Sequence, residues 1–258
     1  MQLGMVPHRP RVGVVHRMAG FVEQAGRPVQ RAELPSGIVP IILTFGDELR
    51  ITSAAGSGRY TSFVAGPHQI PVDTTHDGTL RCVQVDLTPL GAYQLLGPRL
   101  AELRDAVVPV GELLGPTWGD LGERLADLPG WSERFALLDD VLARTASDGR
   151  EPDPEVRSAW LRLTREHGRV TVGRLAEEVG WSRRHFTVRF RQQTGLTPKE
   201  AARVLRFSQA HRLLTAGSAG SISDVAAQAG YADHSHLIRE FHRMAGASPS
   251  RLLTAAGT

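Results

Sequence analysis

One stretch in the C-terminal part of this chain occurs twice, at 172–198 and again at 222–249. In each copy a run of small and aliphatic residues at helical spacing ends at a glycine, Gly180 or Gly230, where a left-handed backbone favours glycine. After an aromatic residue, a second run at helical spacing follows, and the side chains predicted to point inward from it are Phe186, Phe190, Leu237 and Phe241. Two helices joined by a short turn with glycine form a helix-turn-helix, so the repeat predicts two such motifs.

The second helix of the first copy is predicted to read DNA, because in a helix-turn-helix this helix enters the major groove with its N-terminal residues at the base edges. Ser182 is a good N-cap, and the outward residues behind it are rich in guanidinium groups. Arginine can bond O6 and N7 of one guanine, and threonine can bond a base or lay its methyl group against thymine. The candidate DNA contacts of this copy are Ser182, Arg183, Arg184, Thr187 and Arg191.

The second copy is less basic, and its turn is one residue longer, with Asp233 as the expected N-cap. Its candidate DNA contacts are His234, Ser235, His236 and Arg239. Because phosphate neutralisation scales with the number of cationic contacts, the first motif is expected to supply more of the affinity and of the sequence reading. Histidines beside Asp233 also suggest a zinc site, but on a DNA-reading helix contact with phosphate or solvent is the ordinary explanation.

A single helix is predicted between the two copies. Thr197, Pro198 and Glu200 supply an N-cap, a proline at the first helical position and an acidic residue three positions after the cap. The helix should end near Gly217, and about eighteen residues would span roughly 27 Å. Successive major-groove faces on one side of a duplex lie about 34 Å apart. One rigid helix could therefore hold both motifs over one DNA site. Because the helix is shorter than the distance between the groove faces, the DNA is predicted to bend toward the protein.

Four segments match a known pattern in order and spacing: LAEEVGWS, FTVRFRQQTGLTP, ARVLRFSQAHRLL and ISDVAAQAGYADHSHLIREFHRMAGASPSRLL. Through them, the region from Glu155 to Leu253 resembles the DNA-binding domain of AraC/XylS-family bacterial transcription regulators. The resemblance implies seven helices holding two helix-turn-helix units, with the outward residues named above in contact with DNA. Val188 departs from the pattern, because relatives often place a polar or basic residue there.

The charge of the chain is divided between its two parts. Residues 1–150 hold 14 arginines against 17 acidic residues, a net charge of −3, while residues 151–258 hold 15 arginines and Lys199 against 10 acidic residues, a net charge of +6. A basic C-terminal part with arginine clustered on two helices favours a nucleic-acid partner over a merely solvated surface. The polar, proline-bearing segment 147–154 is the expected linker. The predicted domains are an effector-binding or dimerisation domain at 1–150 and a DNA-binding domain at 151–258.

The first part reads as strands and then helices. Short β-rich runs at 11–15, 37–45, 49–54, 61–66, 68–72 and 79–88 are separated by Gly, Asp and Pro turns. A helix is expected from Thr88-Pro89, and 131–145 is an amphipathic helix. This order resembles the cupin-like half of the same family. The predicted fold class is therefore α+β with two domains: a small β-barrel or sandwich, cupin-like, with trailing helices, followed by an all-α domain with two helix-turn-helix motifs.

Neither catalysis nor a cofactor is expected. Catalytic cupins hold a metal with a His-x-His pair, a Glu and a further His, whereas His68 and His76 are eight residues apart without that pattern. The glycines at 56 and 58 lack the lysine and the strand–helix context of a phosphate loop, so a turn is expected there. A single cysteine, Cys82, excludes an intramolecular disulfide or a multi-cysteine zinc site. Arg81 beside it would favour a reactive thiol, but in a valine-rich strand a small buried hydrophobe is the more common role.

The sequence thus predicts a sequence-specific transcription regulator that binds double-stranded operator DNA and is not an enzyme. No signal-peptide pattern and no window near eighteen apolar residues occurs, so a cytoplasmic location without a membrane partner is expected. A small molecule in the barrel, or self-association through 131–142 into a homodimer, is expected to set how the DNA-binding halves meet DNA, and RNA polymerase is a further candidate partner. Three residues of this domain either line a pocket or belong to the core: Phe45, Phe63 and Val85.

An alternative keeps the fold but changes the function: an enzyme or small-molecule-binding protein whose helix-turn-helix pair docks another protein. The cluster of Arg183, Arg184 and Arg191 favours DNA, because protein-docking surfaces are more apolar and aromatic. The operator, the effector and the direction of regulation stay open.

Overall fold

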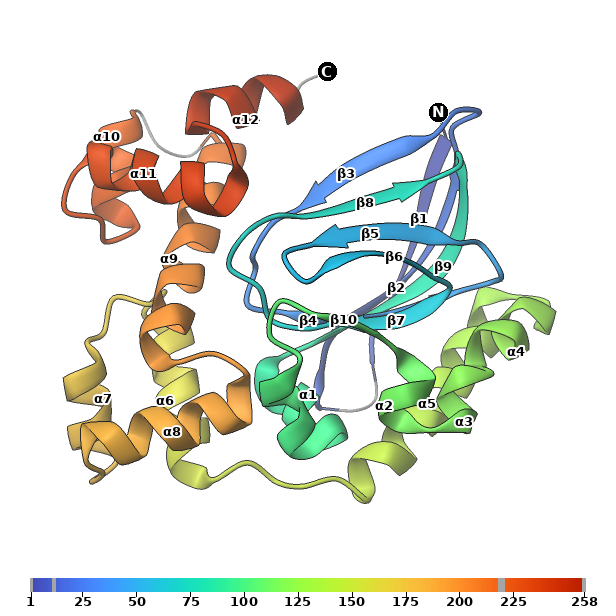
Figure 1. Cartoon of the computed structure of the whole chain (residues 1–258), viewed down its shortest axis with the longest axis horizontal. Coiled ribbons are helices and arrows are strands. Elements are labelled where there is room, and N and C mark those ends of the chain that lie inside the picture. The colour runs from blue at the N-terminus through green and yellow to red at the C-terminus, as the bar shows by residue number, and fades with distance from the viewer. Residues whose placement is uncertain (1, 11–12, 218–220, 257–258) are drawn as a thin grey trace.

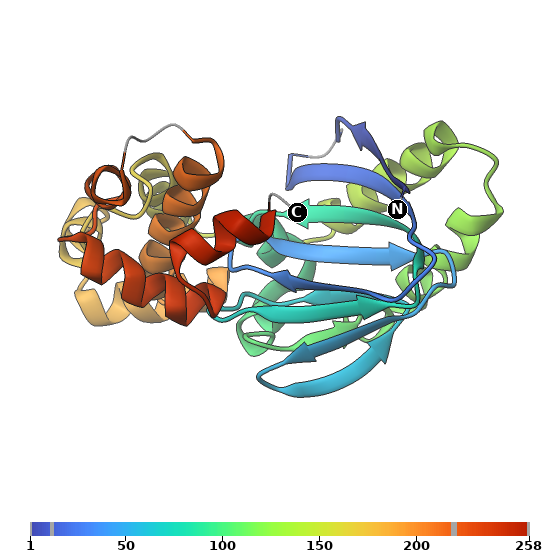
Figure 2. The ribbon, with the colours of Figure 1, turned by 90° about the horizontal axis from the view of Figure 1, so that it is seen from above.

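The computed structural model describes residues 2–10, 13–217 and 221–256. The strands gather at one end of the molecule and the C-terminal helices at the other (Figures 1 and 2). The order of elements, strands first and helices afterwards, confirms the α+β class expected from the sequence.

Two antiparallel sheets form the N-terminal part. The larger sheet has the strand order β1-β2-β9-β4-β7-β10, with β1 at Gln2–His8, β2 at Val15–Gln24, β9 at Thr79–Leu87, β4 at Val39–Thr44, β7 at Ser62–Ala65 and β10 at Val107–Pro109. The smaller sheet has the order β3-β8-β5-β6, with β3 at Val29–Glu33, β8 at Val72–His76, β5 at Leu49–Ser53 and β6 at Gly56–Tyr60. In the described residues no strand of one sheet pairs with a strand of the other, so the expected barrel is an open pair of sheets rather than a closed one.

Helices follow the last long strand. Those of the N-terminal part are α1 at Pro89–Leu96, a 3₁₀ helix η1 at Gly97–Glu102, α2 at Val110–Leu114, α3 at Pro116–Gly119, α4 at Leu121–Asp127 and α5 at Trp131–Ser147. The C-terminal part contains α6 at Pro154–Arg165, α7 at Val172–Glu178, α8 at Arg183–Thr194, α9 at Pro198–Thr215, α10 at Ile222–Gln228, α11 at His234–Ala245 and α12 at Pro249–Ala256. None of the helices in the described ranges is long and apolar enough to cross a bilayer.

Some expected strands are wrong. Of the run 11–15, the first two residues lie outside the described residues, Gly13 and Val14 form a turn, and only Val15 is in a strand. Of the run 68–72 only Val72 is in a strand. The glycines at 56 and 58, expected in a turn, belong to β6, because the hairpin turns two residues earlier, between Ser53 and Gly56.

Three groups of buried apolar side chains hold these elements together. One joins the larger sheet to α1, α4 and α5, and a second fills the C-terminal helices around Phe186, Phe190, Phe207 and Phe241. A third, around Leu49, Ile51 and Phe63, lies on the inner side of the smaller sheet. The core of the C-terminal helices also includes Leu90 of α1 and contacts Leu34, so the two parts of the chain share apolar contacts.

The apolar face of α5 is occupied within the chain. Phe135, Leu138 and Leu142 are buried in the same core as the larger sheet. Trp131 lies on Gly20 so closely that a Cβ there would come within 2.1 Å of the indole ring. The hypothesis of self-association through 131–142 is therefore wrong for this face, because an amphipathic pattern does not say which surface covers it.

Polar and backbone contacts join the C-terminal helices to loops and the 3₁₀ helix of the N-terminal part. Gly195, which ends α8 in a left-handed conformation, packs against Pro67 and the carbonyl of Leu100, where a Cβ would lie 2.8 Å from the Pro67 ring. Arg104 donates to Glu200 at the start of α9, with 2.9 Å between Nη1 and Oε1. Burial opposes ionisation of Glu200, yet hydrogen bonds from Thr197 and the charge of Arg104 lower its pKa overall.

The Arg104–Glu200 pair predicts a pH-dependent stability. Since the pKa of Glu200 is lower in the folded chain, the pair stabilises fully above about pH 4.5 and loses this effect as the pH falls and Glu200 takes up a proton. Arg104→Ala should lower the free energy of unfolding by about 1 kcal/mol at pH 7, because both side chains are partly exposed. Urea unfolding followed by circular dichroism at pH 7 and at pH 4 or below measures this difference.

The matched control is Arg59→Ala, whose partner Glu48 lies on an exposed hairpin and should contribute less than about 0.5 kcal/mol. A difference between the native chain and Arg104→Ala that stays constant as Glu200 is protonated would contradict the prediction.

Candidate nucleic-acid interface

The first helix-turn-helix is formed by α7 and α8. Gly180 adopts the left-handed conformation expected from the sequence, with φ of 71°. Ser182 caps α8, its hydroxyl oxygen accepting a hydrogen bond from the backbone N–H of His185 at 3.3 Å. Phe186 and Phe190 are fully buried, so the opposite side of α8 faces outward. The local signals of the sequence therefore set both the start and the buried face of this helix.

The predicted contact residues of α8 differ in how exposed they are. Ser182, Arg183, Arg184 and Arg191 are exposed, while Thr187 is half-buried and its hydroxyl donates to the carbonyl of Arg183 at 2.8 Å. The guanidinium of Arg183 lies over Gly173 of α7, where a Cβ would come within 2.6 Å of Nη2. Arg184 and Arg191 thus remain the cations on the outward side of α8, and Arg183 extends the positive surface toward α7.

Three further residues of α8 are exposed but were not among the predicted DNA contacts. Val188 is 48% exposed and stands one turn from Arg184 and just under one turn from Arg191. His185 and Gln192 are exposed as well. The sequence indicates Val188 only as a departure from the family pattern, whereas helical spacing from Arg184 places it on the same outward face.

The second helix-turn-helix is formed by α10 and α11 and has a similar geometry. Gly230 has a φ of 78°, and the Asp233 carboxylate accepts the N–H of His236 at 2.7 Å as the expected N-cap. This hydrogen bond, together with the nearby charge of Arg239, lowers the pKa of Asp233. His234, Ser235 and Arg239 are exposed and His236 is half-buried, while His242 and Arg243 add exposed polar groups further along the helix.

The two motifs repeat specific contacts as well as sequence. The aromatic residue after each glycine meets a histidine of the recognition helix edge-on: Trp181 meets His185 at 4.6 Å between ring centroids, and Tyr231 meets His236 at 5.2 Å. Each recognition helix is also anchored by an ion pair at the corresponding position. Arg189 of α8 pairs with Asp153 at 2.6 Å, and Glu240 of α11 pairs with Arg203 of α9 at 2.7 Å. The repeat therefore places both recognition helices by the same kind of contacts.

The helix between the motifs is the one that the sequence predicts. α9 runs from Pro198 to Thr215, eighteen residues, and begins with a complete capping box between Thr197 and Glu200. At 1.5 Å per residue it is about 27 Å long. In Figure 1, α9 runs between the α7–α8 pair at one end and the α10–α11 pair at the other.

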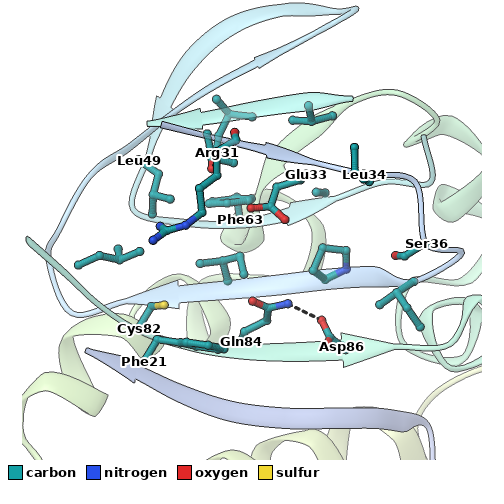
Figure 3. A pocket seen from close by; sticks show the side chains of 18 of the residues that line it. Phe21, Arg31, Glu33, Leu34, Ser36, Leu49, Phe63, Cys82, Gln84 and Asp86 are labelled. Atoms are coloured by element: carbon teal, nitrogen blue, oxygen red, sulfur yellow. Dashed lines mark hydrogen bonds between the residues drawn. The ribbon is translucent and has the colours of Figure 1, made fainter. Parts of the chain in front are cut away.

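A separate cavity of about 610 Å³ lies between the two sheets. It is lined by apolar side chains of both sheets and by a few charged ones, several of which are labelled in Figure 3. Of the three residues left open between pocket and core, Phe63 lines the cavity, whereas Phe45 and Val85 belong to the core between the larger sheet and the helices. Strand alternation explains the difference, because neighbouring residues of one strand face opposite sides of a sheet.

The cysteine and histidines of the N-terminal part have defined surroundings. Burial raises the pKa of Cys82 to about 12, which favours a hydrophobic role over a reactive thiol. His76 lies in β8 and His68 in a loop, while His8 and His16, overlooked as strand residues, lie in β1 and β2. Within the described parts of the chain, no three His, Cys, Asp or Glu side chains gather in a way that could hold a metal ion.

Each part of the chain matches a known family of protein domains. Residues 175–255 match a family described as a helix-turn-helix domain, and residues 14–109 match a family described as a domain of unknown function (DUF6597). An uncharacterised HTH-type transcriptional regulator, YbfI of Bacillus subtilis, is 34% identical over 112 residues, which cover 41% of this chain and 40% of that protein. The HTH-type transcriptional activator RhaR of Klebsiella pneumoniae is 32% identical over 48% of this chain and 38% of its own length.

The chain thus spans about two-fifths of the length of these curated relatives. In overall fold it is similar to ToxT from Vibrio cholerae, with a TM-score of 0.53 over 92% of this chain and 98% of that chain at 11% identity. The two family matches cover the helix-turn-helix part and most of the strands, and the structural likeness extends over both. Residues 175–255 therefore form a helix-turn-helix domain of the AraC type, similar to those of relatives named as transcriptional regulators.

Proposed function

We propose that this protein is a sequence-specific transcription regulator in which both helix-turn-helix motifs bind one double-stranded DNA site. The observation that carries the proposal is the pair of capped recognition helices, α8 and α11, held by α9 with exposed cations on their outward faces. Arg184 and Arg191 on α8, and Arg239 on α11, match the side chains that bond guanine edges and phosphates. The relatives named as transcriptional regulators support the same function.

The two parts of the chain would have different roles. Residues 151–258 would bind DNA, and residues 1–150 would receive an effector or form a dimer contact. A non-enzymatic role agrees with the regulator names of the relatives. Docking of a protein on α8 and α11 is less favoured, because their outward faces hold mainly charged and polar side chains.

A route from the cavity to the DNA-binding helices supports regulation by a small molecule. Leu34, Ser36 and Ile38 line the cavity, while Gly37 between them lies within 3.7 Å of Val204 and Leu205 on α9, measured from its ideal Cβ position. His68 also lines the cavity, and its neighbour Pro67 packs on Gly195 at the end of α8. A ligand that moved these two segments would therefore shift the helices that set the spacing of the motifs.

Selection of bound duplexes from a random DNA library, with the full chain, tests the function and yields the operator. We expect a two-block sequence with blocks about one helical turn apart. Arg184→Ala should then weaken binding to that operator by about 10- to 100-fold and degrade one block, because a bidentate arginine contributes about 1–3 kcal/mol of discrimination. Arg239→Ala should cost less and degrade the other block. Recovery of duplexes without sequence preference, or a larger loss from Arg239→Ala, would contradict this assignment.

Val188 is predicted to read a thymine methyl group, since it is the exposed apolar residue between Arg184 and Arg191. Replacing the contacted thymine by deoxyuridine removes only that methyl and should weaken binding about 3- to 10-fold, in line with about 1 kcal/mol per buried methyl. Val188→Ala should weaken binding to the native operator similarly and make it insensitive to the deoxyuridine. Leu161→Ala, which removes another exposed aliphatic group on α6, is the control and should change neither affinity. Additive losses from the base change and Val188→Ala would exclude the contact.

The length of α9 predicts that the DNA in the complex bends toward the protein, because about 27 Å of helix must serve groove faces about 34 Å apart. Smooth bending of a site of this size costs of order a few kcal/mol, which the additional contacts must offset. Gel mobility of circularly permuted operator fragments measures the bend, with fragments that lack the operator as the control. Mobility independent of the position of the site would show straight DNA and refute the prediction.

A further inference from the structure

Among the described residues, most charged side chains in the cavity between the sheets are held in two sets of ion pairs and hydrogen bonds. One carboxylate, that of Glu33, has no such partner and is called unmatched below. In the first set, Arg31 donates two hydrogen bonds to Glu23, at 2.6 and 2.8 Å. His76 accepts the N–H of Gly78 on Nδ1, which leaves its ring proton on Nε2 to donate to Glu23 at 3.1 Å. Glu23 and His76 are almost completely buried, and hydrogen bonding to Arg31 lowers the pKa of Glu23. The guanidinium of Arg31 is thus already bound to a carboxylate.

The second set is centred on Asp86 of β9. Its carboxylate accepts Arg17 Nε at 2.8 Å and Gln84 Nε2 at 2.7 Å. Asp86 is 5% exposed, so its charge is compensated within the protein. Both arginines that line the cavity in the described part of the chain are therefore paired with carboxylates before any ligand binds.

Glu33 is the unmatched group. Its carboxylate extends from β3 into the space opposite Gln84 and Asp86, which come from the other sheet (Figure 3). Among the residues that the structure describes, its side chain has no hydrogen bond and no ion pair. Glu33 as a residue is exposed, while its carboxyl group is partly shielded from water where it lines the cavity. This loss of water raises the pKa of Glu33; the charge of Arg31 opposes this effect and the charge of Asp86 adds to it. A positive charge placed here would find a carboxylate without a partner.

Most of the remaining cavity wall is apolar, and its other polar residues are His16, Ser36, His68 and Thr74. Phe21 and Ile42 of the larger sheet face Ile51 and Val72 of the smaller one, and Phe63 closes the space behind them. The volume of about 610 Å³ lies within the range of small-molecule sites. A ligand that fits both the apolar wall and the carboxylate of Glu33 has a hydrophobic body and a single polar head.

We propose that this cavity binds an amphipathic organic cation, a protonated amine or amidine on an alkyl or aryl body. The cationic head donates hydrogen bonds to the Glu33 carboxylate and to the free amide oxygen of Gln84, and the body lies against Phe21, Phe63 and Ile51. An organic anion is disfavoured, because Arg17 and Arg31 are held by Asp86 and Glu23 while Glu33 would repel it. The role of the ligand as an effector rests on the proposed function, but its binding does not.

Isothermal titration of the full chain, without DNA, tests the ligand class with three probes of the same shape: 4-phenylbutylamine, 4-phenylbutan-1-ol and 4-phenylbutanoate. We expect the amine to bind at least tenfold more tightly than the carboxylate, with the alcohol between them. Glu33→Gln should remove this preference. Asp73→Asn, the same change of charge at an exposed position of β8, is the matched control and should preserve it. Ala65→Phe, which places a ring into the cavity, should weaken all three probes and so locate the binding.

Several outcomes would overturn the proposal. These are equal or tighter binding of the carboxylate, absence of amine binding, or an amine preference that survives Glu33→Gln or is lost equally in Asp73→Asn. Because no DNA is present, each of these results leaves the regulator function standing, and failure of the operator selection leaves the cavity assignment standing.

Discussion

The carboxylate of Glu200 makes the connection on which the arrangement of the two DNA-facing motifs depends. One oxygen accepts hydrogen bonds from the backbone and hydroxyl of Thr197 and so starts α9 at a fixed residue. The other oxygen pairs with Arg104 of the N-terminal part. A single side chain thus fixes the first turn of the helix that spaces the motifs and joins that turn to the N-terminal part of the chain. Since α9 is rigid over its length, its first turn sets where the second motif lies relative to the first.

The two motifs share their framework and differ in the chemistry of their outward faces. Glycine turns, N-caps, aromatic–histidine contacts and anchoring ion pairs recur in both, because these are the contacts that place a recognition helix. At the centre of the outward face the copies diverge, with Val188 on α8 and Arg239 on α11 at corresponding positions. In the proposed complex the first motif would combine arginine contacts with a methyl contact, and the second would centre on one arginine. Such a division gives the two halves of a site different sequence requirements.

The placement of the cavity connects it physically to those motifs. Its rim includes the segment from Leu34 to Ile38, which touches α9, and His68, which is next to the proline that packs on the end of α8. Packed interfaces move between discrete arrangements rather than deforming continuously, so a ligand need only favour one arrangement of this rim to change the motifs. The unmatched Glu33 lies at the base of the same segment, immediately before Leu34. Binding a cation there would act directly on the strand end that leads to α9.

The sequence by itself determined the C-terminal part and its candidate DNA contacts. Caps, glycine turns and inward apolar residues are local signals, and Ser182, Gly180, Asp233 and the capping box of α9 each act within a few residues. It also predicted α1, α5 and several strands. It missed β1, β3, β6 and β10 and most of β2 and β8. The polar strand Val29–Glu33 owes its form to pairing with the distant β8, and the glycine-rich strand Gly56–Tyr60 owes its form to pairing with β5 across a hairpin, rather than to the propensities of their own residues.

Only the tertiary structure decided which surfaces and charges remain free. The apolar face of α5 is covered by its own core, Arg183 leans on α7, and Arg189 is held by Asp153, none of which is visible in periodicity. The cavity likewise arises from strands far apart in the chain, and Glu33 stands out there only because the arginines around it are already paired. Local hydrogen bonds are encoded by neighbours in sequence, whereas burial and charge balance depend on residues that meet only when the chain has folded.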